Sequence, residues 1–99
     1  MSDAVHRYLL AYDVGSDIRR TRVAKLLEAH GDRIQYSVFV VDTRPAKMLR
    51  LKVNVVARLH LDTDSLLICD LGPLGDESRR RLERVGARRV LTGDSALII

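Results

Sequence analysis

One aspartate at the end of an apolar run, followed by a cluster of arginines, combines residue types that could do chemistry. Residues 8–22 read YLLAYDVGSDIRRTR, so Asp13 closes the apolar run and Arg19, Arg20 and Arg22 follow it. A carboxylate placed before a helix often accepts hydrogen bonds from the first helical amides. It can also bind Mg²⁺, which prefers oxygen ligands and commonly takes one or two carboxylates while keeping several waters. Position alone favours the helix cap.

The arginines admit two interpretations of the same kind. Arg19, Arg20, Arg22 and Lys25 could form an ordinary solvated helix surface. Near a helix N-terminus, however, guanidinium groups and main-chain amides both favour negative charge, which suits the phosphate of a nucleic acid. A second basic stretch, with six arginines over residues 79–89, could follow a nucleic-acid backbone or simply face solvent. The sequence has only four aromatic residues, which favours contact with the backbone over stacking on bases.

The composition restricts the class of protein. With 99 residues, 46% hydrophobic and 30% charged, the chain is expected to form a single domain over 1–99 with one small core. No apolar run approaches the roughly 20 residues of a membrane helix and no signal peptide is evident, so we expect a cytoplasmic protein without membrane contact. The net charge of +4 favours a polyanionic partner. Cys69 is the only cysteine, and we expect its thiol to be buried and inert.

The first half of the chain is predicted to form a strand, a helix and a long strand. The apolar run over 7–14 is typical of a strand buried on both faces. Helical spacing of apolar residues follows from Asp17 until Gly31 ends the segment. The segment 33–43 then alternates as a strand that bends or splits near Ser37.

The second half is predicted to contain a helix, a strand and a tail. Thr43 is expected to cap a helix with Pro45 in its first turn, and Leu49 and Val55 are expected on its inner side. The run SLLICDL, residues 65–71, reads as another buried strand. Two short apolar pieces near the C-terminus, RVL and ALII, read as one or two edge strands.

If the middle strand splits, the order becomes β-α-β-β-α-β, the α+β ferredoxin-like arrangement. Its antiparallel sheet carries both helices on one face, so its other face needs a cover, and a partner sheet in a sheet-to-sheet homodimer is the natural one. In such a two-fold dimer two Asp13 carboxylates near the axis could hold one ion between them. The core would span about 7–74, and the tail, about 75–99, could complete the partner's sheet.

Two pieces of the sequence resemble the CRISPR-associated Cas-two family. They are YLLAYDV, residues 8–14, and IRRTRVAKLLEAHGDRIQYSVF, residues 18–39. The family's pattern is an apolar strand ending in Tyr-Asp, an arginine-rich helix, a glycine, and then Arg-x-Gln-x-Ser-Val-Phe. The resemblance covers essentially residues 7–74, and beyond about residue 75 it extends only to length and character.

The resemblance implies a ferredoxin-like homodimer with a metal-dependent endonuclease activity on single-stranded RNA or double-stranded DNA. The implied cofactor is Mg²⁺, with Mn²⁺ as the alternative ion. The implied partners are RNA or DNA and the Cas-one integrase, with which the family takes part in spacer acquisition and antiviral defence.

The family's motif also assigns roles to particular residues. The metal-binding, catalytic aspartate falls on Asp13, with Tyr12 before it. The residues implied to contact nucleic acid are Tyr12, Arg20, Arg22 and Arg33, and the supporting motif positions are Ser37 and Phe39.

Three functions remain open at this point. The first is a hydrolase, an endonuclease in which a metal activates water and arginines hold the scissile backbone. No residue is an obvious general base, so solvent or the activated water itself would have to serve. The second is a non-catalytic dimeric scaffold that binds DNA and the integrase, and the third is a toxin-like ribonuclease of the same fold.

Overall fold

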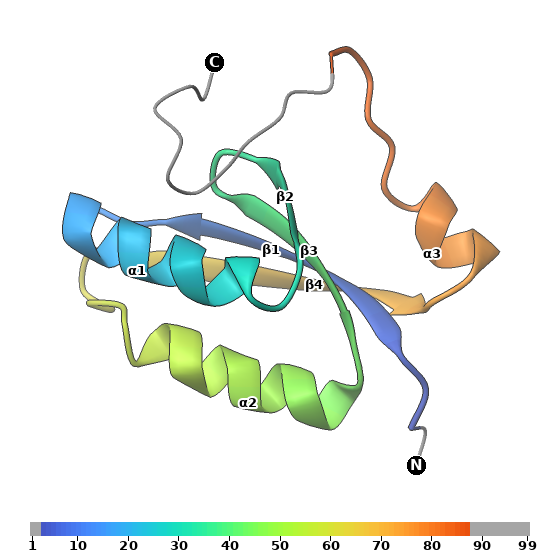
Figure 1. The fold of residues 1–99 in the computed structure, drawn as a ribbon, viewed down its shortest axis with the longest axis horizontal. Helices are drawn as coiled ribbons and strands as arrows, with labels where there is room; N and C mark the ends of the chain where they lie inside the picture. Colours follow the sequence, from blue (N-terminus) through green and yellow to red (C-terminus); the bar gives the residue numbers. More distant parts are fainter. Residues whose placement is uncertain (1–2, 88–99) are drawn as a thin grey trace.

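The computed structural model describes residues 3–87, which form one four-stranded sheet with two long helices on one face (Figure 1). In chain order the elements are β1 (His6–Asp13), α1 (Asp17–Glu28), β2 (Asp32–Gln35), β3 (Val38–Thr43), α2 (Pro45–Val56), β4 (Ser65–Pro73) and α3 (Asp76–Arg80). The strands lie in the order β2-β3-β1-β4, and every neighbouring pair is antiparallel. The predicted ferredoxin-like arrangement is confirmed. The predicted pieces RVL and ALII lie outside the described residues.

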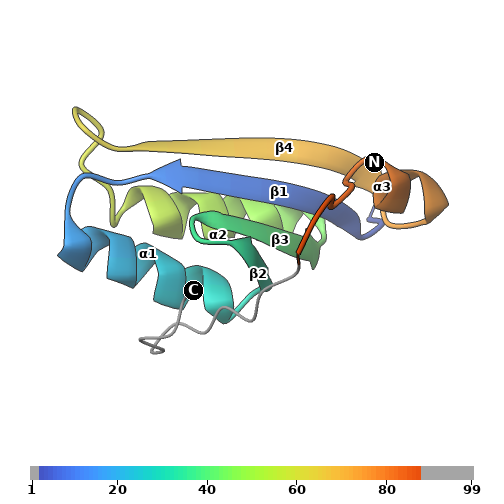
Figure 2. The same ribbon diagram turned by 90° about the horizontal axis from the view of Figure 1, so that it is seen from above.

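β1 lies between β3 and β4 in the sheet, and its side chains alternate between the two faces of the sheet. Tyr8, Leu10 and Tyr12 face the helices and are at most 5% exposed. Leu9 lies on the other face, opposite Val40 of β3 and Cys69 of β4. Figure 2 shows both long helices on the same side of the sheet, so this second face is left without a helix. We call it the open face.

The open face explains why one sequence prediction is wrong. Cys69 is exposed, whereas the apolar run around it predicted a buried thiol. Its neighbours Ile68 and Leu66 pack against the core, so Cys69 and Leu67 alternate onto the open face, where Leu67 is 69% exposed. The composition of β4 predicts burial on both faces, but within the single chain only one face is covered.

The segment that was predicted to bend does split, at Tyr36 and Ser37 between β2 and β3. The main-chain oxygen of Ser37 accepts a hydrogen bond from the Tyr12 amide at 3.1 Å, so the turn holds the last residues of β1. Gly31, where α1 gives way to β2, is required by space. A Cβ there would lie 2.2 Å from the main-chain oxygen of Val40.

Two details of α2 differ from the prediction. Thr43 ends β3 and the helix is capped by Arg44, without any side-chain hydrogen bond, while Pro45 occupies the first turn as expected. The buried residues of α2 are Met48, Leu51 and Val55, and Leu49 is 61% exposed. Leu49 and Met48 are adjacent and both apolar, so the spacing pattern alone did not decide which one faces the sheet. Among residues 3–87 no helix has the length and apolar character to cross a membrane.

Candidate functional site

Asp13 is the last residue of β1, and its side chain is exposed. By strand alternation from the buried Tyr12, its carboxylate belongs to the open face, where its pairing partner in β4 is Ser65. Within residues 3–87 this carboxylate has no hydrogen bond or ion pair. Its oxygens are therefore available for a ligand from outside the chain.

The helix-cap role is taken by another residue. The Oγ atom of Ser16 accepts a hydrogen bond from the Arg19 amide at 3.3 Å, and Ser16 has the extended backbone of an N-cap. Asp13 lies before the turn that leads to this cap. The interpretation of Asp13 as the cap of α1, which position alone favoured, is thus not what the structure shows.

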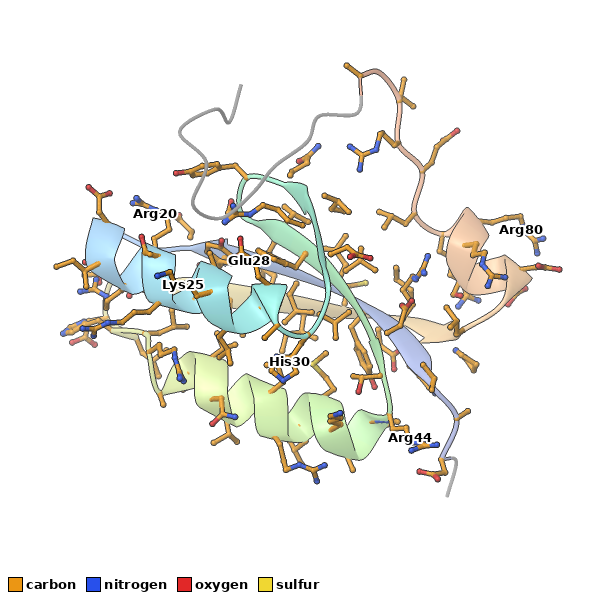
Figure 3. The ribbon with its side chains drawn as sticks, viewed as in Figure 1. Arg20, Lys25, Glu28, His30, Arg44 and Arg80 are labelled. Atoms are coloured by element: carbon orange, nitrogen blue, oxygen red, sulfur yellow. The ribbon has the colours of Figure 1, made fainter. Side chains whose placement is uncertain are left out.

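Arg20 and Arg22 differ in the contacts that their side chains make with the rest of the protein. Arg20 donates to the main-chain oxygen of Val14 at 2.8 Å and pairs with Asp17, and its side chain is 31% exposed. The hydrogen bond to Asp17 raises the pKa of Arg20, which stays charged. Arg22 is exposed and its side chain has no partner within the described residues. Figure 3 shows Arg20 on α1 close to where that helix begins.

Three further motif residues lie together, but inside the molecule. Arg33 lies over the rings of Phe39, at 5.2 Å, and Tyr36, at 5.7 Å, and its Nη2 donates to the Tyr12 hydroxyl at 3.4 Å. Its Nη1 is 3.7 Å from a carboxylate oxygen of Glu28, and its Nε has no hydrogen-bond partner in the described part of the chain. The Arg33 side chain is only 7% exposed. This cluster packs between sheet and helices, on the face opposite Asp13.

The motif residues therefore divide into two groups. Asp13 and Arg22 are open to solvent, and Arg20 is partly so. Tyr12 and Phe39 are buried at 5% and 0% exposure, with their rings stacked at 6.2 Å. As placed here, the side chains of the second group support the end of β1. Their contact with nucleic acid stays a prediction.

The basic stretch after β4 is also partly engaged by the fold. Arg79 and Arg80 of α3 are exposed, whereas Arg81 donates to the main-chain oxygen of Leu71 at 2.7 Å and Arg84 donates to that of Ile34 at 3.3 Å. These two contacts tie the residues after α3 to the strands.

Asp64 is a residue that sequence reasoning missed. It lies just before β4, is 5% exposed, and accepts two hydrogen bonds from Arg19, Nε at 2.7 Å and Nη2 at 3.1 Å. It also accepts from the amides of Gly15 at 3.0 Å and His60 at 2.8 Å, and from the Thr63 hydroxyl at 3.2 Å. A signal was present, because an acid stood directly before a buried strand, but its main partner is far away in the sequence.

The Arg19 hydrogen bonds, helped by the two amides and Thr63, hold the pKa of Asp64 well below its ordinary value, against the opposing effect of desolvation. Arg19, which the sequence offered as a phosphate ligand, is thus paired with a buried carboxylate.

The donor set fits a shared divalent ion. Within residues 3–87 no three His, Cys, Asp or Glu side chains gather as a metal cluster, and Asp13 is the unpaired carboxylate at this strand end. Its carboxylate oxygens are the ligand type that Mg²⁺ prefers, and one or two carboxylates with waters are a usual set for that ion. A second copy facing the first across the open face would supply the second carboxylate.

Comparison with known proteins shows related chains. The model of the family described as CRISPR associated protein Cas2 matches residues 6–84. A relative from Rhodospirillum rubrum, CRISPR-associated endoribonuclease Cas2 3, is 35% identical over 96 residues, which cover 92% of this chain and 98% of the relative. Another protein of that organism, CRISPR-associated endoribonuclease Cas2 4, is 38% identical over 64 residues, covering 65% of this chain and 52% of that protein.

Solved structures share the fold. The crystal structure of Streptococcus pyogenes Cas2 superposes with a TM-score of 0.68 at 32% identity, covering 81% of this chain and 99% of that one. The family-model match over residues 6–84 includes β1 to β4, and with them Asp13 at the end of β1 and Asp64 in the loop before β4. The chain belongs to the CRISPR-associated Cas2 family.

Proposed function

We propose that this chain acts as a homodimeric, metal-dependent endonuclease that hydrolyses phosphodiester bonds of RNA or DNA during CRISPR spacer acquisition and antiviral defence. The observation that carries the proposal is the Asp13 carboxylate, which is exposed at the end of a central strand and has no partner within residues 3–87. Such a carboxylate offers the oxygen ligands that Mg²⁺ prefers.

The open face supports the dimer. Leu67 is 69% exposed there and Cys69 is also exposed, and Leu9 lies opposite Cys69 on the neighbouring strand β1. Apolar surface of this kind marks an interaction site in a water-exposed protein. Pairing two such faces about a two-fold axis that passes near the end of β1 would bring the Asp13 carboxylates of both copies together.

The residues divide the chemistry in a simple way. The two Asp13 carboxylates would hold Mg²⁺, or Mn²⁺ as the alternative, and the bound ion supplies charge stabilisation for the phosphate under attack. Arg22, free and exposed, can bind a phosphate oxygen next to it. Arg20 holds the Val14 carbonyl and so fixes the turn after Asp13, with part of its guanidinium still facing solvent. The proton of the attacking water leaves to solvent, since no side chain is positioned as a base.

The names of the relatives favour RNA as one substrate. Both Rhodospirillum rubrum proteins carry the name endoribonuclease. The same carboxylate and arginine surface would serve duplex DNA, because phosphate contacts do not distinguish sequence and only the 2′-hydroxyl distinguishes the sugars.

A second candidate function is a non-catalytic scaffold that binds DNA and the Cas1 integrase. The observation that favours it is the distribution of exposed arginines: Arg22 lies on α1, and Arg79 and Arg80 lie on α3, at the opposite end of the sheet from the start of α1 (Figure 1). Positive charge spread over the molecule suits a long duplex better than one scissile bond.

A nuclease assay separates the two. Purified wild-type protein and Asp13→Ala are incubated with a panel of single-stranded RNA and duplex DNA, with Mg²⁺ and with chelator. The proposal predicts cleavage that chelator abolishes and Asp13→Ala lowers by about a hundredfold or more. Cleavage unaffected by both changes would identify a contaminant. Spacer acquisition that persists with Asp13→Asn, in cells whose cleavage is lost, would favour the scaffold.

A further inference from the structure

The buried Asp64 has a structural reason to act on the site, because it lies where three segments meet. Its two carboxylate oxygens together receive hydrogen bonds from Arg19 of α1, from Gly15 in the turn after β1, and from His60 and Thr63 in the loop before β4. The fork of Arg19 meets both oxygens, which is the strongest arrangement of an arginine and a carboxylate. The Asp64 side chain is 0% exposed, while the Arg19 side chain is 30% exposed, so the acceptor oxygens of these hydrogen bonds are buried.

Two of the segments that Asp64 joins lie next to Asp13. Gly15 is two positions beyond Asp13 along the chain, and Ser65, which follows Asp64, is the pairing partner of Asp13 across the sheet. A shift of the Asp64 carboxylate would therefore move the end of β1 through the Gly15 amide and the end of β4 through its own main chain.

Arg20 completes the support from the other side of the turn. Its guanidinium donates to the main-chain oxygen of Val14, while Asp64 accepts from the next amide, that of Gly15. The Val14 carbonyl and the Gly15 amide are thus both held by charged side chains. Charge-assisted hydrogen bonds are roughly twice as strong as neutral ones, so these two contacts hold the turn after β1 firmly in place.

We propose that Asp64 is a positioning residue for the metal site: through Arg19 and the Gly15 amide it fixes the turn that sets the direction of the Asp13 carboxylate. This inference rests on the proposed metal-dependent function. An ion shared by two copies would be bound by the Asp13 carboxylate of each, so a displacement of this carboxylate in the variant would affect both protein ligands. Groups that orient a metal ligand typically contribute about 10- to 100-fold to metal affinity.

The test measures binding of Mn²⁺ alone to the full-length dimer, by electron paramagnetic resonance or calorimetry, well below the unfolding temperature. The variants are Asp13→Asn, Asp64→Ala and Met48→Ala. Met48 is a core residue near the start of α2, 5% exposed, and its truncation lowers stability without touching the turn. We expect Asp64→Ala to weaken Mn²⁺ binding at least about tenfold and Met48→Ala to change it less than about twofold.

The outcomes test the proposed metal site and the positioning role of Asp64 separately. If wild type and Asp13→Asn bind Mn²⁺ equally, the proposed metal site is wrong. If Asp13→Asn loses the ion while Asp64→Ala keeps wild-type affinity, or if Asp64→Ala and Met48→Ala lose it equally at matched stability, the positioning role is wrong. Should Asp64→Ala not fold, Arg19→Ala gives the same reading, because it removes the charged partner and leaves Asp64 three other donors.

A second readout separates positioning from substrate binding. With RNA as substrate, a positioning role predicts that Arg19→Ala lowers kcat while KM changes less than about threefold, because Arg19 is engaged with Asp64 and does not contact the substrate. A rise in KM at unchanged kcat would return Arg19 to the class of phosphate ligands and overturn the assignment.

Discussion

At the scale of single residues, the neighbours Tyr12 and Asp13 show how strand alternation separates two roles. Asp13 is exposed on the open face, and Tyr12 is buried against Phe39 and Arg33 on the helix face. The sequence predicted all of these as parts of one motif. Strand alternation predicts that neighbours lie on opposite faces, but the sequence could not show which of the two faces the helices cover.

Arg22 and Arg33 provide a matched pair for testing that division. Arg33→Ala removes a buried side chain that packs on two rings and bonds Tyr12, so we expect the free energy of unfolding to fall by about 1–3 kcal/mol. Arg22→Ala removes an exposed side chain and should change it by less than about 0.5 kcal/mol. Urea unfolding followed by circular dichroism measures both.

The same pair should behave in the opposite order toward nucleic acid. Arg22→Ala is expected to weaken binding of single-stranded RNA in a salt-dependent way, with the slope against salt reduced by about one charge. A larger loss of binding for a folded Arg33→Ala than for Arg22→Ala would show that Arg33 leaves its buried position to contact the substrate, against the division drawn here.

At the scale of the elements, α1 was predicted well and α2 less well. α1 begins at Asp17, as predicted, but its cap is Ser16 and not Asp13. Arg44 begins α2 without a side-chain cap, and the choice between Met48 and Leu49 for the core depends on the sheet beneath. Asp64 is the clearest case of a non-local determinant, since its partner Arg19 belongs to another element.

Replacing the α1 cap separates Ser16 from Asp13. Ser16→Ala should lower the free energy of unfolding by about 1 kcal/mol, because one amide at the helix start loses its acceptor. Asp13→Asn should leave the free energy of unfolding nearly unchanged, because the Asp13 carboxylate has no partner within the described chain. Thermal unfolding of both variants is the measurement, and equal losses would restore Asp13 to the cap.

The contact between α1 and the loop before β4 predicts a pH dependence. The hydrogen bonds from Arg19, and then those from Gly15, His60 and Thr63, lower the pKa of Asp64 in the folded state from its ordinary value of 3.8, against the opposing effect of burial. Its stabilising effect is therefore complete above the unfolded pKa and is lost as pH falls toward the folded one. The difference in unfolding free energy between wild type and Asp64→Asn should be largest near about pH 6 and shrink below about pH 4. A difference that stays constant over this range would mean that the charge of Asp64 contributes nothing.

At the scale of the whole molecule, the sequence predicted the ferredoxin-like arrangement because strand and helix periodicities alternate in the required order. The open face follows from that topology, and with it the exposure of Leu67 and Cys69. The sequence could not show which side chains of the apolar strand β4 remain exposed in the single chain, because helices cover only one face of the sheet. The exposed thiol is the visible consequence.

A dimer through the open face has a direct test with an internal control. Leu67→Asp places a charge in the proposed contact, and Val53→Asp places one on the outer side of α2, where Val53 is 62% exposed. Sedimentation at micromolar concentration should give a dimer for wild type and Val53→Asp, and a monomer for Leu67→Asp, because a buried unpaired charge is costly. A Leu67→Asp dimer would exclude the open face as the interface.

In the proposed dimer, two Asp13 carboxylates share one metal ion. The direct measurement is a calorimetric titration of the wild-type protein with Mn²⁺, repeated with Asp13→Asn. We expect about one ion per two chains for wild type and loss of that binding in the variant. Binding of one ion per chain, or binding that survives Asp13→Asn, would contradict it.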